Sequence, residues 1–390
     1  MWPRTDAQAR LLATAEDLAA RFALTAPAHD REGSFPHEHF EAMRRAGYLA
    51  AAVPAEYGGA GHGLDDLVLA QIALGRGDGS TALSVGMHHM VVGTEAVARR
   101  WPDALRDRVF REVASDGALV NNIAAEPEMG SPRGGGRPAT TLTPDGRGGW
   151  LLAGRKTFST LSPVLTWAIV FAAVEDDSGD TARVLVRCDA PGVRVEETWD
   201  SMSMRSTGSH DMFFEGVAVT EADIVARRPS GAPPPEGRPE AWFPLLVAAA
   251  NLGVAYAARD YAVRFAQERR PTGAPAPIAK IPHVREQVAR MEASLVAART
   301  MLLTAAEDYQ YHPERDADLG VQIPIAKRLA TETAVEVTDL ALRIVGGVGL
   351  QRSEPLERYF RDVRSGLVNP PIEARALEQI AAHVLDQRLD

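Results

Sequence analysis

The sequence predicts a mostly α-helical protein with a central β domain: an N-terminal helical domain, a small antiparallel β barrel or sandwich, and a C-terminal four-helix bundle. Three observations predict this order: amphipathic stripes in the first third, short β-rich runs in the middle, and four long helical patterns at the end. We place the domains at residues 1–120, 121–226 and 241–390, with a Pro- and Gly-rich connector at 227–240.

The first third contains segments that are typical of amphipathic helices. Residues 7–24 carry apolar side chains at spacings of three and four, which places them on one helix face. Ser34 and Pro36 are typical of a helix start, because serine caps the first turn and proline fits within it, and Gly47 ends that helix. Further helices are expected at Leu64–Gly75, 80–97 and 102–115.

The middle third has short runs rich in β-branched and aromatic residues, separated by Gly, Pro and Asp clusters. The runs are Leu119–Ala124, Trp150–Ala153, Trp167–Val174, Arg183–Cys188, Val193–Glu197 and Met212–Val219. Because no helix-length segment separates them, we expect antiparallel pairing and not a parallel sheet.

The last third contains four long helical patterns joined by modest loops, which favours an antiparallel bundle. The patterns lie at about 241–268, 281–309, 321–345 and 370–387.

Composition limits the classes of partner. The 390 residues carry a net charge of −10 with no basic stripe, so nucleic acid is not an expected partner. No apolar run reaches the ~18 residues that a membrane span needs, and the N-terminus lacks a signal-peptide pattern, so we expect a cytoplasmic protein without a membrane partner. The single cysteine, Cys188, lies in an apolar run and is expected to be a buried structural thiol.

Two polar clusters are better explained without chemistry. Ser209-His210-Asp211 has residue types of a catalytic triad, but consecutive strand residues point to opposite faces. His37-Glu38-His39 lacks a third ligand and lacks the i, i+4 spacing that puts two imidazoles on one helix face. We therefore expect a solvated helix end there and predict no metal site.

Two segments of the β domain carry residues that suit a planar ligand. Glu126-Pro127 to Gly130-Ser131 closes a β-run with a turn, where glycine permits close backbone approach and the serine hydroxyl can bond a ligand. The run from Gly154 places Lys156, Phe158 and Thr160 on one strand face by alternation. An aromatic plane beside a hydroxyl can flank a planar ring, although an ordinary barrel strand explains this segment equally well when it is taken alone.

These blocks, with Gly346-Gly347 and Arg361-Asp362 further on, resemble in order and spacing the acyl-CoA dehydrogenase superfamily of FAD enzymes over nearly the whole chain. The resemblance implies that the turn Ala125–Ser131 and the strand end Phe158-Ser159-Thr160 hold the isoalloxazine of FAD. Phe158 would stack near the flavin and Thr160 would hydrogen-bond around N5. Ala125 stands where the family has threonine, so one flavin hydrogen bond is lost or comes from the backbone.

The resemblance also extends to the bundle. Arg269 matches the arginine of the family's Arg-x-x-Phe-Gly turn, which grips the FAD pyrophosphate of a neighbouring subunit, and Thr272 replaces the aromatic residue. Arg343 stands where a glutamine often precedes the two glycines, Gly346 and Gly347, that let the dinucleotide approach the backbone. Because these contacts serve a partner chain, the resemblance implies a homodimer or a homotetramer.

The main departure from the family concerns the catalytic base. In the dehydrogenases a glutamate removes the α-proton of an acyl-CoA thioester while a hydride passes from the β-carbon to flavin N5. The matching position here is Pro370. A few members of the family instead draw the base from the helix that enters the bundle, and the matching place here, near Phe243-Pro244, is not acidic either. The nearest carboxylates are Glu240, before that helix, and Glu373. Dehydrogenation of an acyl-CoA with a relocated base is one hypothesis, and an electron-transfer flavoprotein would then be the partner.

The alternative is the flavin-dependent monooxygenase branch of the superfamily, which needs no α-proton base and is served by a flavin reductase. Such members carry a His-x-Pro loop where this chain has Asn369, and an active-site histidine where it has His88. Asn369 could orient a substrate, and His88 could equally be a helix histidine satisfied by its neighbours. A flavin-binding protein without catalysis is the third hypothesis.

Overall fold

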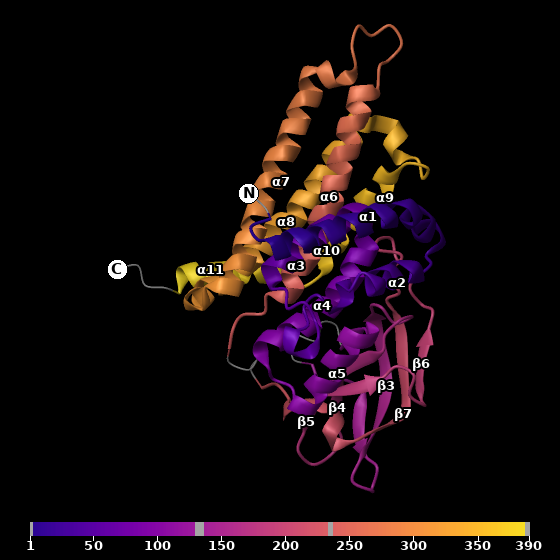
Figure 1. The fold of residues 1–390 in the computed structure, drawn as a ribbon, viewed down its shortest axis with the longest axis vertical. Helices are drawn as coiled ribbons and strands as arrows, with labels where there is room; N and C mark the ends of the chain where they lie inside the picture. The colour runs from indigo at the N-terminus through magenta and orange to yellow at the C-terminus, as the bar shows by residue number, and fades with distance from the viewer. Residues whose placement is uncertain (1–2, 129–135, 233–236, 387–390) are drawn as a thin grey trace.

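The computed structural model describes residues 3–128, 136–232 and 237–386. The helical bundle and the β sheet lie at opposite ends of an elongated molecule, and helices α1 to α4 lie between them (Figure 1). The predicted fold class, helical at both ends of the chain with a central β domain, is confirmed.

The N-terminal domain is helical. The Thr5 hydroxyl caps the first helix by accepting from the Gln8 N–H, and Gly33 ends it in the left-handed conformation with φ 67°. The Asp78 carboxylate caps the fourth helix by accepting from the Thr81 N–H. The helices are α1 (Asp6–Glu32), α2 (His37–Arg45), α3 (Leu64–Gly77), α4 (Gly79–Ala98) and α5 (Asp103–Asp116).

The central domain is one sheet whose strands follow the order β6-β7-β3-β2-β4-β5-β8, with β1 paired to β4. Its strands are β1 (Val120–Ile123), β2 (Thr141–Pro144), β3 (Trp150–Ser159), β4 (Trp167–Val174), β5 (Asp180–Arg187), β6 (Val193–Glu196), β7 (His210–Val219) and β8 (Ile224–Pro229). β1 and β2 both run parallel to β4, and the other pairs are antiparallel.

Two features of the sheet differ from the expectation. The short strands β2 and β8 were not predicted, because each ends at a proline, a residue that is disfavoured within a sheet. The two parallel pairings were also not predicted, because side-chain alternation indicates which face of a strand is buried but not its direction.

The C-terminal bundle consists of α6 (Trp242–Glu268), α7 (Pro282–Tyr311), α8 (Asp316–Val345) and α11 (Glu373–Leu385). Two short helices, α9 (Pro355–Asp362) and α10 (Ser365–Val368), connect the last two. Glycine joins the bundle to the N-terminal domain: a Cβ on Gly253 of α6 would lie 2.3 Å from the Ile72 carbonyl oxygen of α3. The helices therefore approach closely, which fixes the N-terminal domain against the bundle.

Two smaller expectations concern the surface and the cysteine. Among the described helices, none combines the length and the apolar composition that crossing a lipid bilayer requires. Cys188 is half-buried, and burial raises the pKa of its thiol to about 12, so it stays protonated at neutral pH.

Candidate functional site

An exposed aromatic ring stands at the end of β3. Phe158 has φ 53° and is 63% exposed, although it is flanked by the buried Lys156 and Ser159. Its only described ring neighbour is Trp199, in edge-to-face contact with 5.7 Å between the ring centroids. A left-handed backbone and an exposed phenylalanine are both unfavourable in isolation, which is typical of a position kept for a ligand.

A chain of hydroxyl groups lies beside this ring. Thr160 Oγ1 is 2.9 Å from Ser209 Oγ, which in turn is 2.7 Å from Thr207 Oγ1. The Thr160 carbonyl accepts from Asn121 Nδ2 at 3.0 Å. The Ser159 hydroxyl is buried and has no partner among the described residues. These groups offer unused hydrogen-bonding capacity next to Phe158.

Lys156 does not share the face of Phe158 and Thr160, which corrects the expectation from alternation. The register between β3 and β7 shifts between Lys156 and Ser159, so Lys156 turns inward and is fully buried. Its Nζ lies 2.6 Å from Glu126 Oε1, and the Thr140 N–H donates to the same oxygen. Burial alone would raise the pKa of Glu126, but the bonds from Lys156 and Thr140 lower it overall, so the pair is ionised.

The buried pair anchors the start of the turn that was expected to hold the flavin. The Ala125 carbonyl accepts from the Thr157 N–H at 3.0 Å, so the backbone before the turn is tied to β3. Two residues predicted for this turn, Gly130 and Ser131, lie outside the described residues.

The predicted bundle residues form a separate, open region. Arg269 ends α6, is exposed, and its guanidinium forms no ion pair or hydrogen bond with any described residue. The exposed Thr272 follows in the same loop. Gly346, with φ 69°, and Gly347 begin the turn after α8, and a Cβ on either would meet nothing within 4 Å. Arg343 is paired with Asp339 at 2.7 Å on the helix surface.

These bundle residues do not meet Phe158 within one chain. The loop between α6 and α7, which contains Arg269, is at the end of the molecule that points away from the sheet (Figure 1). The structure therefore brings together Phe158, Ser159 and Thr160 but leaves the arginine-bearing loop at a distance from them.

The loop at the position of the family's catalytic glutamate contains no carboxylate. Between Asp362 and Glu373 the sequence has no aspartate or glutamate. Asn369 caps α10, and its Nδ2 donates to the Ser365 carbonyl at 2.9 Å. Glu373 is exposed and paired with Arg328 at 2.9 Å.

The start of α6, the second place where the family resemblance puts a base, is also apolar. Helix α6 has no aspartate or glutamate from its start to Arg259, and Glu240 is an exposed residue two positions before the helix. Val247 of α6 packs with Leu83 and Met87 of α4 and with Met204. The helix therefore presents an apolar surface to α4.

His88 has no free ring nitrogen. It is fully buried; the Val120 N–H donates to Nδ1 at 3.2 Å, and Nε2 lies 2.8 Å from the Leu49 carbonyl, to which it donates. Burial lowers the pKa of His88 to about 4, so the ring is neutral. This is the arrangement of a structural helix histidine, which was the alternative that the sequence left open.

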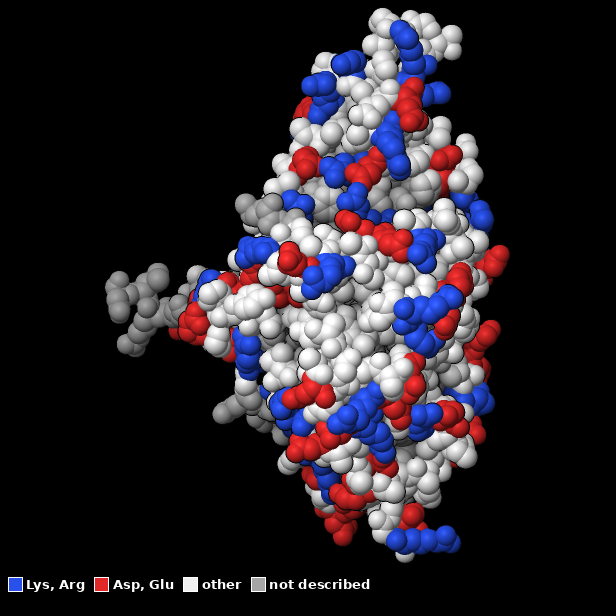
Figure 2. All heavy atoms as spheres, in the orientation of Figure 1, with Lys and Arg blue, Asp and Glu red and all other residues white. Residues whose placement is uncertain are grey.

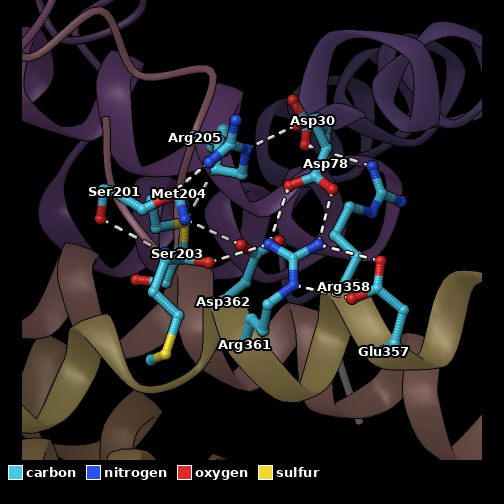
Figure 3. A network of polar contacts seen from close by, with 12 residues as sticks. Asp30, Asp78, Ser201, Ser203, Met204, Arg205, Glu357, Arg358, Arg361 and Asp362 are labelled. Carbon is cyan, nitrogen blue, oxygen red and sulfur yellow. Dashed lines mark hydrogen bonds and ion pairs between the residues drawn. The ribbon is translucent and has the colours of Figure 1, made fainter. Parts of the chain in front are cut away.

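A buried network of charges joins α9 to the other two domains (Figure 3). Arg361 pairs with Asp30 of α1 at 2.6 Å and with Glu357 at 2.7 Å. Asp362 Oδ1 accepts from the Met204 N–H at 2.8 Å, and this bond fixes a residue of the β domain that has φ 52°. Burial raises the pKa of Asp362 to about 7.

The network was missed as a unit because its members are distant in sequence. Arg361-Asp362 was recognised only as a charged step, and nothing in the sequence linked it to Asp30 or Met204. Met204 packs with Leu83, Met87 and Val247. The network therefore helps to position this apolar cluster through the bond between Asp362 and the Met204 N–H.

The residues present fit a flavin in two respects. Phe158 offers an exposed aromatic edge beside free hydroxyl capacity, which suits a planar heteroaromatic ring. Arg269 and the open Gly346-Gly347 turn offer a cation and unobstructed backbone, which suit a pyrophosphate. The two sets lie in different parts of the chain.

Comparison with known proteins identifies the family. Profiles of the acyl-CoA dehydrogenase N-terminal, middle and C-terminal domains match residues 5–116, 122–217 and 244–369. The putative acyl-CoA dehydrogenase YdbM of Bacillus subtilis is 41% identical over 372 residues, which cover 95% of each chain. L-evernosamine nitrososynthase of a Micromonospora strain is 32% identical over 94% of this chain and 89% of its own.

Solved structures agree with the sequence matches. KijD3, solved in complex with FMN and dTDP-3-amino-2,3,6-trideoxy-4-keto-3-methyl-D-glucose, superposes with a TM-score of 0.87 at 31% identity, over 100% of this chain and 96% of that chain. With all three domain profiles matched in order, the chain belongs to the acyl-CoA dehydrogenase family of flavin-dependent oxidoreductases.

Proposed function

We propose that this chain is a flavin-dependent monooxygenase of the acyl-CoA dehydrogenase family, which oxygenates a small molecule. One observation carries the proposal: both places that supply the α-proton base in the dehydrogenases lack a carboxylate here. The loop position is Pro370, and α6 has no acidic residue before Asp260. Removal of an α-proton needs a base beside the substrate, whereas oxygenation by a reduced flavin does not.

Two relatives support the oxygenase assignment. The nitrososynthase relative and KijD3 each align along nearly the whole chain at 32% and 31% identity. KijD3 was solved with an amino sugar nucleotide, so a small amine is the first substrate class to test. Bound flavin would supply two-electron reduction of molecular oxygen, and a flavin reductase would supply the electrons.

We further propose FAD as the cofactor, held by two subunits. Phe158, Ser159 and Thr160, with the turn Ala125–Ser131, would bind the isoalloxazine, because they offer an exposed ring and free hydroxyl capacity. Arg269 and Thr272, with the turn from Arg343 to Gly347, would bind the pyrophosphate of a neighbouring chain. The distance between the two regions within one chain supports a homodimer, or a homotetramer built from two such dimers (Figure 1).

The chain's own residues would exclude water and orient the substrate. The apolar cluster of Leu83, Met87, Met204 and Val247 lines the side of α4 and α6 that faces away from solvent. Asn369 would contact the substrate through its carbonyl oxygen, since its Nδ2 is already bonded to Ser365. Neither role requires a proton to be removed from carbon.

Two spectroscopic experiments test the reaction. The FAD-loaded protein is mixed anaerobically with acyl-CoAs of short, medium and branched chains, and the visible absorption band of oxidised flavin is followed. We expect no bleaching. In air, with a flavin reductase and a panel of amines, we expect substrate-dependent oxygen consumption and a product heavier by one oxygen atom. Rapid bleaching by any acyl-CoA would contradict the proposal.

A second candidate function is acyl-CoA dehydrogenation with Glu240 as the base, and an electron-transfer flavoprotein as the partner. The observation that favours it is the 41% identity to a putative acyl-CoA dehydrogenase. The variant Glu240→Gln tests this second function. If Glu240 is the base, the rate of flavin bleaching by an acyl-CoA should fall by at least roughly 100-fold. An unchanged rate would exclude Glu240, and bound FAD without either reaction would indicate a non-catalytic flavoprotein.

A further inference from the structure

The fold supplies a third metal-ligating side chain to the His37-Glu38-His39 segment. His29, near the end of α1, places Nε2 2.6 Å from Glu38 Oε1, and His39 Nε2 lies 3.9 Å from the same oxygen. All three ligand atoms lie within 4.8 Å of one another. The sequence suggested a solvated helix end here, but the structure shows that His39 is buried. Its side chain is 2% exposed, and its ring stacks on that of Phe22 with 4.1 Å between the ring centroids.

Hydrogen bonds fix the tautomer of His39. The Thr81 hydroxyl donates to Asp78 Oδ2 at 2.6 Å, so it can only accept from the histidine Nδ1–H, which lies at 2.7 Å. The lone pair of His39 is therefore on Nε2, where it accepts a hydrogen bond from the Thr25 hydroxyl, and an ion that bound Nε2 would displace this bond. A hydroxyl or carboxylate behind Nδ1 is the usual second contact of a metal-bound histidine.

His29 is oriented in the same way. Its Nδ1 lies 2.8 Å from Ser34 Oγ, and the serine hydroxyl can donate onward to Glu32 Oε2 at 3.4 Å. The ring is thus held from the Nδ1 side, and Nε2 faces the Glu38 carboxylate. Thr25, one turn before His29 on the same face of α1, places its hydroxyl 2.7 Å from His39 Nε2.

We propose that His29, Glu38 and His39 bind one divalent transition-metal ion, and that the ligand set of two imidazoles and one carboxylate selects Zn²⁺. Zinc takes such ligands at about 2.0–2.2 Å in a tetrahedral arrangement with water in the fourth position. Small rotations of the side chains reach this geometry, because the Glu38 side chain is 52% exposed and its surroundings leave room for it to move. The carboxylates of Asp78 and Glu32 behind the ring nitrogens offset the remaining positive charge.

The ion would join α1 to α2 next to the charge network of α9. Asp30, the residue after His29, pairs with Arg361, and Asp78 Oδ1 lies 3.8 Å from Arg358 Nη1 (Figure 3). A metal clamp here would therefore hold the ends of α1 and α4 that support α9. This is a structural role, separate from any reaction of the flavin.

The test uses the full chain without a purification tag, stripped by dialysis against a chelator and titrated with zinc sulfate against a chromogenic competing chelator. We expect one Zn²⁺ per chain in the natural protein. His29→Gln and Glu38→Gln should each weaken binding by at least roughly tenfold. His37→Gln is the matched control, because His37 is exposed, lies in the same turn and belongs to no ligand group.

A second readout guards against misfolded variants. Circular dichroism establishes that each variant is folded, which we expect since both substituted side chains reach the surface. The unfolding temperature should rise with Zn²⁺ in the natural protein and in His37→Gln, and not in the other two variants. No stoichiometric binding in the natural protein, or equal binding in all variants, would overturn the proposal and leave a hydrogen bond between His29 and Glu38 as the explanation of the cluster.

Discussion

Two arginine-bearing regions of the molecule are built in opposite ways. Arg361 is a half-buried residue of α9 that faces α1, and two carboxylates and a carbonyl surround its guanidinium. Arg269 lies in the loop after α6, exposed and without a described partner. The surface mixes cations and anions without a single-sign field on the face that Figure 2 shows, so neither arginine is explained by general charge steering. The difference teaches that the first arginine is saturated by its own chain, whereas the second has its bonds free for a ligand.

The largest effect should come from Arg361→Ala. The substitution leaves Asp30 and Glu357 without their shared cation, and Asp30 is only 7% exposed in its side chain. Breaking one side of a buried pair costs about 3–5 kcal/mol in free energy of unfolding. Urea denaturation of the two proteins measures the difference.

Arg343→Ala is the control for that comparison. It removes an exposed i, i+4 pair with Asp339, which is worth less than about 0.5 kcal/mol. If Arg361→Ala were no more costly than this control, the network would not be a stabilising unit.

The next effect concerns pH and Asp362. Its pKa is raised from 3.8 to about 7 by burial, so the protonated carboxyl is the form that the fold prefers. Its contribution to stability is therefore present below the ordinary aspartate pKa and is lost as the pH rises through about 7. The free energy of unfolding of the natural protein, relative to Asp362→Asn, should fall between the ordinary pKa of 3.8 and about pH 7 and should level off above it.

The size of this change is a few kcal/mol at most, since each unit of pKa shift corresponds to about 1.4 kcal/mol. Denaturation of both proteins at four pH values measures it. A difference that stays constant or grows with pH would mean that Arg358 and Arg361 keep Asp362 ionised throughout.

The smallest effect should come from Arg269→Ala, and it should depend on the cofactor. A charge-assisted bond to a pyrophosphate is worth about 1.5–3 kcal/mol, so FAD should bind roughly 10- to 100-fold more weakly. FMN, which lacks the second phosphate, should bind with unchanged affinity. Fluorescence titration with both flavins measures this.

Arg270→Ala is the matched control, because the Arg270 Nε donates to the carbonyl of Ala274 in its own loop. It should leave both affinities unchanged. Equal losses for FAD and FMN in the Arg269 variant would indicate a disturbed loop and not a lost phosphate contact.

Local patterns predicted the helices and the order of the domains, because caps, amphipathic stripes and glycine ends act within a few residues. Contacts between distant segments were not predictable. The partners of His88 are 39 and 32 residues away from it, and Asp30 is 331 residues away from Arg361. The inward turn of Lys156 depends on a register shift against β7, which one strand's sequence cannot reveal.

The candidate site divides along the same line. Phe158 and Thr160 were proposed for the site from alternation and family resemblance, but Ser209 was not, because its bond to Thr160 arises from the fold. His29 lies on a different helix from Glu38, so the third member of that cluster had no signal in the local sequence. The absence of a carboxylate near Pro370 could be predicted from the sequence, because it depends on residue types alone and not on contacts between distant segments.

The position of the α6–α7 loop, at the tip of the molecule opposite the sheet, has a consequence for mixed assemblies (Figure 1). A chain carrying Arg269→Ala still has an intact β3 end, and a chain altered at Phe158 still has an intact tip. When the two are produced together, hybrids would regain one working cofactor pocket from two individually defective polypeptides. Such complementation requires a pocket that is shared between two chains. It would not occur if each chain bound flavin entirely with its own residues.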